Sequence, residues 1–179
     1  MSGSMDERLA AADAALKAGR ADEAIARLTE LLEADPAQAA QVYRALLLHL
    51  YKAGSLEEGV RWGEAAIERY PRELEILNLL GVFYRRLLRF PEALAILDRA
   101  AKLSPNNVPV QSNRGNVLLD IGEPARAEAV FAKLVRAEPR NSDHQRQLGR
   151  ALLRQGKVGA AMTRLRQAVA LKKDHIEAW

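Results

Sequence analysis

Apolar residues recur along the chain with the spacing of amphipathic helices, and the predicted helices come in pairs joined by short turns. The clearest pair lies between Leu77 and Pro105. Gly81 and Ala93 are small, so two antiparallel helices can approach closely at those positions. Pro105 cannot continue a helix and therefore ends the second one. The residues predicted to fill the seam between the two helices are Leu80, Tyr84, Leu94 and Leu97.

The same reading predicts further helices in the rest of the chain. Ser55 and Glu58 have the spacing of a capping box, which predicts a helix start at Leu56. Leu47 stands where other pairs have glycine and takes up more space. Gly59 and Gly63 on the facing helix are expected to compensate by leaving room for it. Other predicted helices cover residues 6–17, 21–34, 110–121 and 158–171, with one more starting at Pro124.

Helix-breaking and small residues return at a fixed period of about 34 residues, which is typical of a helical solenoid. Pro71, Pro105 and Pro139 follow this period, and so do Gly81, Gly115 and Gly149, which are expected at close helix contacts. Turn glycines recur at Gly19, Gly54, Gly122 and Gly156, whereas Leu88 occupies that place in the third pair. One extra residue is predicted near Ala37 to Ala40, because Pro36 precedes Pro71 by 35.

The order Leu80-Gly81, Tyr84, Ala93, Leu97 and Pro105 resembles the tetratricopeptide repeat (TPR) signature W-x₂-L-G-x₂-Y…A-x₃-F…P. Leu77 takes the Trp position and Leu97 the Phe position. The resemblance implies an all-α fold, a right-handed TPR superhelix (an α-solenoid) of about five helix-turn-helix repeats. Residues 1–179 would form a single array. Its repeats are predicted at 5–37, 38–72, 73–106, 107–141 and 142–174, with 175–179 starting a truncated sixth.

Composition narrows the possible partners. The chain has no cysteine, which excludes disulfides and thiol chemistry and agrees with a cytoplasmic location. No apolar run approaches the roughly 20 residues that span a bilayer, so no membrane association is expected. From Arg140 to Lys173 nine Lys or Arg residues stand against one acid, Asp143. No aromatic residues interleave with these cations, so no platform for stacked bases exists and nucleic acid is not expected.

We find no set of residues with the chemistry of catalysis. His49, His144 and His175 are isolated in the sequence and are predicted to be surface or turn residues. Phosphate-binding, dinucleotide-binding and nucleophile-elbow glycine motifs are absent. The sequence therefore predicts no enzyme activity, no cofactor and no metal site.

The first helix of each repeat lines the inner surface of a TPR superhelix, and such concave surfaces bind other chains. Asparagine amides can hold a peptide backbone, and arginines can bind its carboxylates. An acidic protein or peptide segment is therefore the expected partner. By helical phase the predicted groove residues are Arg44, Leu48, Tyr51, Asn78, Val82, Arg85, Arg86, Asn113, Asn116, Arg146, Arg150 and Arg154.

Two more specific resemblances bear on this groove. Asn113-Arg114-Gly115-Asn116 is similar to the inward N-L-G-N motif in the repeats of O-linked N-acetylglucosamine transferases, with Arg in place of Leu. The carboxylate clamp of chaperone-binding TPR domains is not found, because Leu48, Leu79 and Gln147 interrupt it.

Three functions remain open at this point. The first is a protein-protein interaction module that binds peptide segments in its concave groove. The second is the substrate-recruiting N-terminal part of a larger glycosyltransferase or sulfotransferase. The third is a self-assembling scaffold, because Leu165, Ala168, Val169 and Leu171 of the last helix are predicted to lack a covering repeat.

Overall fold

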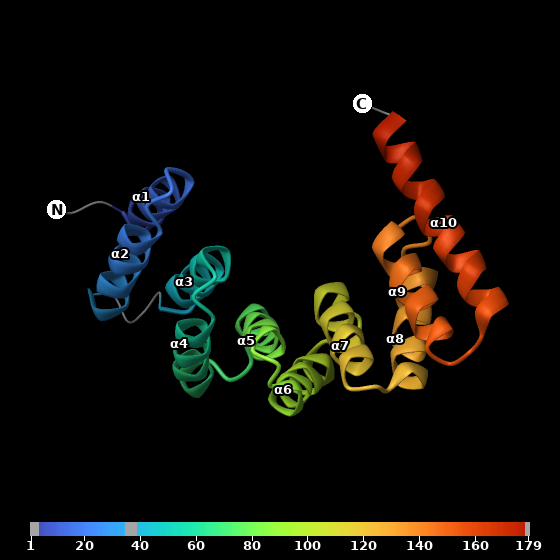
Figure 1. Ribbon diagram of the computed structural model, residues 1–179. Coiled ribbons are helices and arrows are strands. Elements are labelled where there is room, and N and C mark those ends of the chain that lie inside the picture. The colour runs from blue at the N-terminus through green and yellow to red at the C-terminus, as the bar shows by residue number, and fades with distance from the viewer. Residues whose placement is uncertain (1–3, 35–38, 178–179) are drawn as a thin grey trace. The chain divides into compact units, whose positions relative to one another are not determined.

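The computed structural model describes residues 4–34 and 39–177, and this part of the chain consists of helices and turns without strands (Figure 1). It forms two units, Met1–Arg89 and Phe90–Trp179, which are described separately. The helices of the first unit are α1 Met5–Lys17, α2 Ala21–Ala34, α3 Ala39–Ala53, α4 Leu56–Arg69 and α5 Leu74–Arg86. Those of the second unit are α6 Phe90–Leu103, α7 Val108–Asp120, α8 Pro124–Ala137, α9 Ser142–Leu153 and α10 Val158–Glu177.

Several predicted element boundaries agree with the structure. The helices predicted at 6–17 and 21–34 are α1 and α2, and α4 and α8 begin at Leu56 and Pro124 as expected. Residues 35–38 lie outside the described residues, and they include half of the stretch from Ala37 to Ala40 where an extra residue was predicted.

In the first unit each helix packs on the next, and α3 also contacts α5. Leu46, Leu47 and Leu50 of α3 are fully buried. The glycines of α4 lie against α5, a contact that the prediction did not include. A Cβ added at Gly59 would overlap the ring of Phe83, and one at Gly63 would lie 2.9 Å from Leu80 Cδ1. These glycines therefore make room for the following helix of the array.

In the second unit α7, α8 and α9 share one apolar core. Leu118 and Leu119 of α7 meet Phe131 and Leu134 of α8 and Leu148 of α9 there. The prediction that periodic glycines mark close helix contacts is confirmed at two positions. A Cβ at Gly115 would lie 2.6 Å from Phe131 Cζ. One at Gly149 would lie 2.8 Å from Leu165 Cγ.

The turns between paired helices use left-handed backbone. Gly19, Gly54, Gly122 and Gly156 have φ between 72° and 80°, a region that glycine enters without steric cost. Leu88 closes the corresponding turn with φ 60° and a side chain that is 72% exposed. This turn therefore forms without glycine, as predicted, but with a strained residue.

Two helix ends differ from the prediction. α7 begins at Val108 because the Asn107 side chain accepts a hydrogen bond from the Val110 amide. α10 continues to Glu177 and does not end at Leu171. Lys173 stands where proline ends the second helix of other repeats, so nothing there interrupts the helix.

The capping box predicted at the start of α4 is not formed. The Ser55 side chain makes no capping hydrogen bond, and Glu58 accepts from Arg61 Nη2 at 3.3 Å instead. α4 starts at the predicted residue because the turn around Gly54 positions its first backbone hydrogen bonds, among them Gly59 N to Ser55 O at 3.0 Å.

Candidate binding surfaces

The predicted groove residues of the first unit lie on α3 and α5, two helices in contact. Leu48 and Tyr51 are exposed on α3. The Tyr51 ring meets the Phe83 ring edge-on, with centroids 6.2 Å apart. The Arg86 guanidinium lies 5.3 Å from the centroid of the same Tyr51 ring. We call Leu48, Tyr51 and Arg86 the α3–α5 strip, a surface that offers aliphatic, aromatic and cationic groups together.

The remaining groove residues of this unit are less available. Arg44 forms ion pairs with Glu75 at 3.4 Å and with Glu73 at 3.9 Å, both near the start of α5. Asn78, Val82 and Arg85 of α5 are partly buried. Arg44 therefore joins α3 to α5 and its charge is largely balanced within the unit.

In the second unit, α7 and α9 border a polar hollow of about 280 Å³. Asn116 Oδ1 accepts from Gln147 Nε2 at 2.5 Å, and Gln147 Oε1 accepts from Arg150 Nη1 at 2.8 Å. Arg146 Nη2 donates to Asp143 Oδ1 at 3.1 Å. We call this the α7–α9 hollow. Its lining residues are Ser112, Asn116, Phe131, Asn141, Asp143, His144, Arg146 and Gln147.

The structure brings together only some of the predicted residues of this unit. Asn116 and Arg146 line the hollow, and Arg150 is linked to it through Gln147. Asn113 is partly buried and does not line it. Arg154 donates to the carbonyl of Leu119 at the end of α7. Arg154 therefore ties α9 to α7, because a cation at the carbonyl end of a helix is favourable.

Both described histidine side chains are buried, which corrects the prediction of surface or turn positions. His49 is 2% exposed, with Nδ1 2.7 Å from the Ala45 carbonyl oxygen and Nε2 3.3 Å from Asp13 Oδ1. His144 has Nε2 3.1 Å from Ser112 Oγ and Nδ1 3.3 Å from Glu138 Oε2. The His175 side chain lies outside the described residues.

Aligning the repeats with one another predicts that His144 is buried. His144 lies one repeat after Val110 and two repeats after Ile76, and both of these are buried. His144 therefore occupies an apolar position of the repeat, where a hydroxyl contacts one ring nitrogen and a carboxylate lies near the other.

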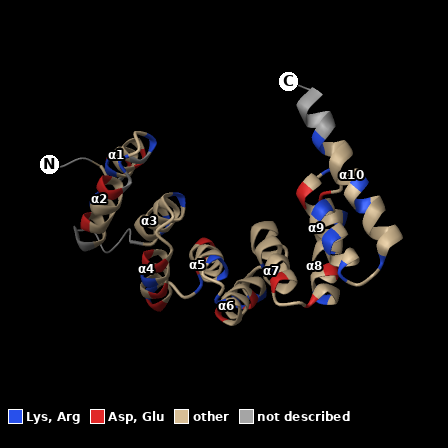
Figure 2. Ribbon diagram, viewed as in Figure 1, with Lys and Arg blue, Asp and Glu red and all other residues tan. Residues whose placement is uncertain are grey.

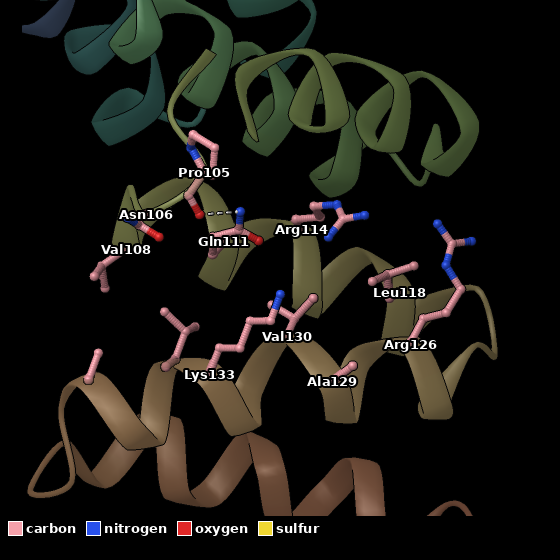
Figure 3. A pocket seen from close by; sticks show the side chains of 12 residues that line it. Pro105, Asn106, Val108, Gln111, Arg114, Leu118, Arg126, Ala129, Val130 and Lys133 are labelled. Carbon is pink, nitrogen blue, oxygen red and sulfur yellow. Dashed lines mark hydrogen bonds between the residues drawn. The ribbon is translucent and has the colours of Figure 1, made fainter. Parts of the chain in front are cut away.

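A second cavity, the outer groove, lies between α7 and α8 and was not predicted (Figure 3). Its volume is about 440 Å³, and its apolar lining includes Leu118, Val130 and Leu134. Arg126 and Lys133 extend from α8 toward it, and Arg114, paired with Asp98, lies on α7 (Figure 3). The sequence shows these cations but not that they surround one groove.

Charge in the second unit is concentrated on α9 and α10, where Lys and Arg predominate (Figure 2). One acid that meets these cations is Glu128 of α8, whose Oε2 accepts from Lys157 Nζ and from Gln155 Nε2, both at 2.7 Å. The bond from Lys157, followed by that from Gln155, lowers the pKa of the Glu128 carboxyl. This carboxylate therefore fastens α8 to the start of α10.

Among residues 4–34 and 39–177 no group of three His, Cys, Asp or Glu side chains is placed to hold a metal ion. Over the same described part, no helix is both long and apolar enough to cross a bilayer.

Paired helices of 12 to 15 residues, except for the 20-residue α10, with glycines at close helix contacts, define a helical-repeat protein. A tetratricopeptide repeat model matches residues 9–73, 49–108 and 112–175. The chain belongs to the tetratricopeptide repeat family, whose members are protein-interaction modules.

Solved TPR structures share this fold. A crystal structure of MamA matches with TM-score 0.82 and 19% identity, over 93% of this chain and 96% of that one. MamA from Desulfovibrio magneticus RS-1 matches with TM-score 0.70 and 25% identity, over 77% and 78%. YrrB, described as a TPR protein with an unusual peptide-binding site, matches with TM-score 0.75 and 21% identity, over 94% and 87%.

A curated human relative is the protein O-mannosyl-transferase TMTC2. It is 26% identical over 92 residues, which is 50% of this chain. The matching region spans 11% of the length of that relative.

Proposed function

We propose that this protein is a non-catalytic cytoplasmic module that binds extended, acid-containing peptide segments through the first helices of its repeats. The observation that carries the proposal is the α7–α9 hollow. There, amide groups of Asn116 and Gln147 adjoin the guanidinium groups of Arg146 and Arg150. Amides can exchange their mutual hydrogen bond for bonds to a peptide backbone, and guanidinium groups bind carboxylates at two points.

The α3–α5 strip supports the same function in the first unit. Tyr51 is exposed on one side while Phe83 and Arg86 fix its ring. A rigid aromatic side chain contributes contact area at a low cost in conformational entropy. Together with Leu48 it suits an apolar side chain of a bound segment. We infer that the first unit offers a binding surface of its own.

The test measures fluorescence anisotropy of labelled acidic peptides selected from an array. Arg146→Glu with Arg150→Glu should weaken binding at least about tenfold, because like charges then face the ligand. Asn113→Ala with Asn116→Ala should weaken it less. Wild-type affinity should be about micromolar, since the peptide loses conformational entropy on binding. Added salt should reduce it, since screening acts over about 8 Å at physiological ionic strength.

The matched control is Arg126→Glu with Lys133→Glu, an equal change of charge on the outer groove of the same unit. This pair should leave peptide binding within about twofold of wild type, because exposed charges away from the contact contribute little. Loss of binding in the control with retention in Arg146→Glu and Arg150→Glu would move the site to the outer groove and overturn the proposal.

The match to TMTC2 favours a second candidate, in which this array recruits substrates for a larger transferase. Peptide binding would then serve a catalytic domain elsewhere in the same protein. The sequence of the full gene decides this, because a catalytic domain in the same reading frame is required.

A further inference from the structure

The last repeat exposes apolar side chains at positions that the preceding repeat buries. Leu119 of α7 is 0% exposed, whereas Leu153, one repeat later on α9, is 51% exposed. Val135 of α8 is 7% exposed, and its counterpart Val169 on α10 is 60% exposed. Leu119 and Val135 share a core with α9. The face formed by α9 and α10 is therefore one that a further helix, packed like α9, would cover.

A polar contact that α8 makes with the last repeat has no counterpart on α10. This difference indicates which residues a helix covering α9 and α10 should carry. Between α8 and the last repeat, Glu128 Oε2 accepts from Gln155 Nε2 at 2.7 Å. The counterpart of Glu128 is Met162, which is 46% exposed on α10. An amide opposite Met162 would lose the carboxylate that Gln155 bonds at 2.7 Å, so a small apolar residue suits this place of the covering helix better.

α1 of the same protein has this property. Gly19 and Gly156 close equivalent turns, so the positions before them correspond one to one, and Ala18 takes the place of Gln155. Ala10 takes the place of Gln147, and both alanines are exposed. α1 therefore offers small apolar side chains to the larger ones of α10.

The same correspondence brings opposite charges together. His144 of α9 meets Ser112 of α7 at 3.1 Å. The counterpart of His144 in α1 is Glu7, and the counterpart of Ser112 in α9 is Arg146. Glu7 would thus face Arg146, whose side chain is 46% exposed. A contact between a buried histidine and a partly buried serine inside the chain becomes an ion pair between two chains.

The charges of the two ends agree with this pairing. Residues 4–34 carry seven Asp or Glu against four Lys or Arg. Residues 140–173 carry nine Lys or Arg against one acid. Red segments are frequent on α2 and blue ones on α9 and α10 (Figure 2). Complementary potentials of this kind steer association and fix its register.

We propose that α1 of a second copy of this chain docks on α9 and α10 as α9 docks on α7 and α8. The contact joins two different surfaces, so each bound copy presents its own α9 and α10 to another. Association is then concentration-dependent and open to more than two copies. It requires no peptide, but Arg146 belongs to both surfaces, so a peptide bound in the α7–α9 hollow should compete with α1 of a second copy.

The experiment is sedimentation velocity on the full chain over a concentration series, without peptide. Wild type should show species larger than a monomer at high concentration, and fewer of them as salt increases. Glu7→Arg should reduce association at least about tenfold, because it places like charges together. Arg146→Glu should do the same. Asp22→Arg, an equal charge change on an exposed residue of α2, is the control and should leave association unchanged.

Mixing the two variants gives the decisive result. The side chain introduced by Glu7→Arg in one variant can pair with that introduced by Arg146→Glu in the other. The unchanged Arg146 of the first variant also meets the unchanged Glu7 of the second, so the mixture should recover open-ended association with the two variants alternating, while each variant alone stays mostly monomeric. The double variant with both changes should recover open-ended association. A wild type that stays monomeric throughout the series overturns the proposal. So does association that Val169→Glu abolishes while Glu7→Arg leaves it intact, because α10 would then pair with itself.

Discussion

At the scale of single residues, glycines in this chain have two different environments. Gly115 lies where α7 meets α8, and an added Cβ would be 2.6 Å from Phe131 Cζ. Gly159 of α10 has no heavy atom within 4 Å of the same position. The repeat period identified Gly115 as a contact residue from the sequence. A helix contact at Gly59 was also expected, but the ring of Phe83 was not, because it comes from the following repeat.

Gly115→Ala should lower the free energy of unfolding by about 1–3 kcal/mol, because Phe131 is buried and cannot move away freely. Gly159→Ala should be neutral or raise it by up to about 1 kcal/mol through helix propensity alone. Urea unfolding of both variants measures the difference. Equal effects would mean that α7 and α8 are not in close contact at Gly115.

Leu88 permits a test of backbone strain. With φ 60° and a largely exposed side chain, it has the backbone of a glycine turn and little packing to lose. Leu88→Gly should raise the free energy of unfolding by about 1 kcal/mol, since the left-handed region costs a leucine roughly 1–2 kcal/mol. The reverse change, Gly122→Leu, should lower it by a similar amount. A less stable Leu88→Gly protein in thermal melts would argue against the strain.

At the scale of secondary-structure elements, two helix starts show that a capping pattern in the sequence does not always produce a capping hydrogen bond. The Asn141 side chain accepts from the amides of Asp143 and His144, both at 3.1 Å, and caps α9. Ser55 has a better-known capping pattern but makes no such bond. Spacing predicts which residues can cap a helix, whereas the backbone angles of the preceding turn decide whether the side chain reaches. These backbone angles depend on tertiary packing, which cannot be deduced from the spacing of residues in the sequence.

Asn141→Ala should therefore lower the free energy of unfolding by about 1 kcal/mol. Ser55→Ala should change it by less than about 0.5 kcal/mol, because no hydrogen bond is lost. Chemical denaturation of the two variants under one condition makes the comparison. A larger effect at Ser55 would show that the capping box forms in solution after all.

The candidate site was also predicted in part. Helical phase predicts Asn116 and Arg146 on one face, and in the structure both line the hollow between α7 and α9. Phase alone assigned Arg154 to that face, but its side chain reaches the end of α7. In the sequence Gln147 only interrupts another motif, whereas in the structure it joins Asn116 to Arg150. Contacts between long polar side chains depend on rotamers, which periodicity does not determine.

At the scale of the whole molecule, stability in a repeat array comes from each repeat and from its contact with the next. Leu119 and Leu153 occupy the same position of successive repeats. Leu119 is fully buried in the core that α7, α8 and α9 share, whereas Leu153 is half exposed. The same substitution, made separately at each position, therefore measures how much a covering repeat contributes to the free energy of unfolding. The side chain and its position in the helix are the same in both cases.

Leu119→Ala should lower the free energy of unfolding by about 2–5 kcal/mol, because it leaves a cavity among packed side chains. Leu153→Ala should cost less than about 1 kcal/mol, because the half-exposed side chain loses little apolar contact and leaves no enclosed cavity. Both are measured by urea unfolding at a protein concentration low enough to keep the chain monomeric. At high concentration the cost of Leu153→Ala should rise if a second copy covers α9, since association stabilises the folded chain by mass action. A cost near that of Leu119→Ala at low concentration would mean that Leu153 is already covered within one chain.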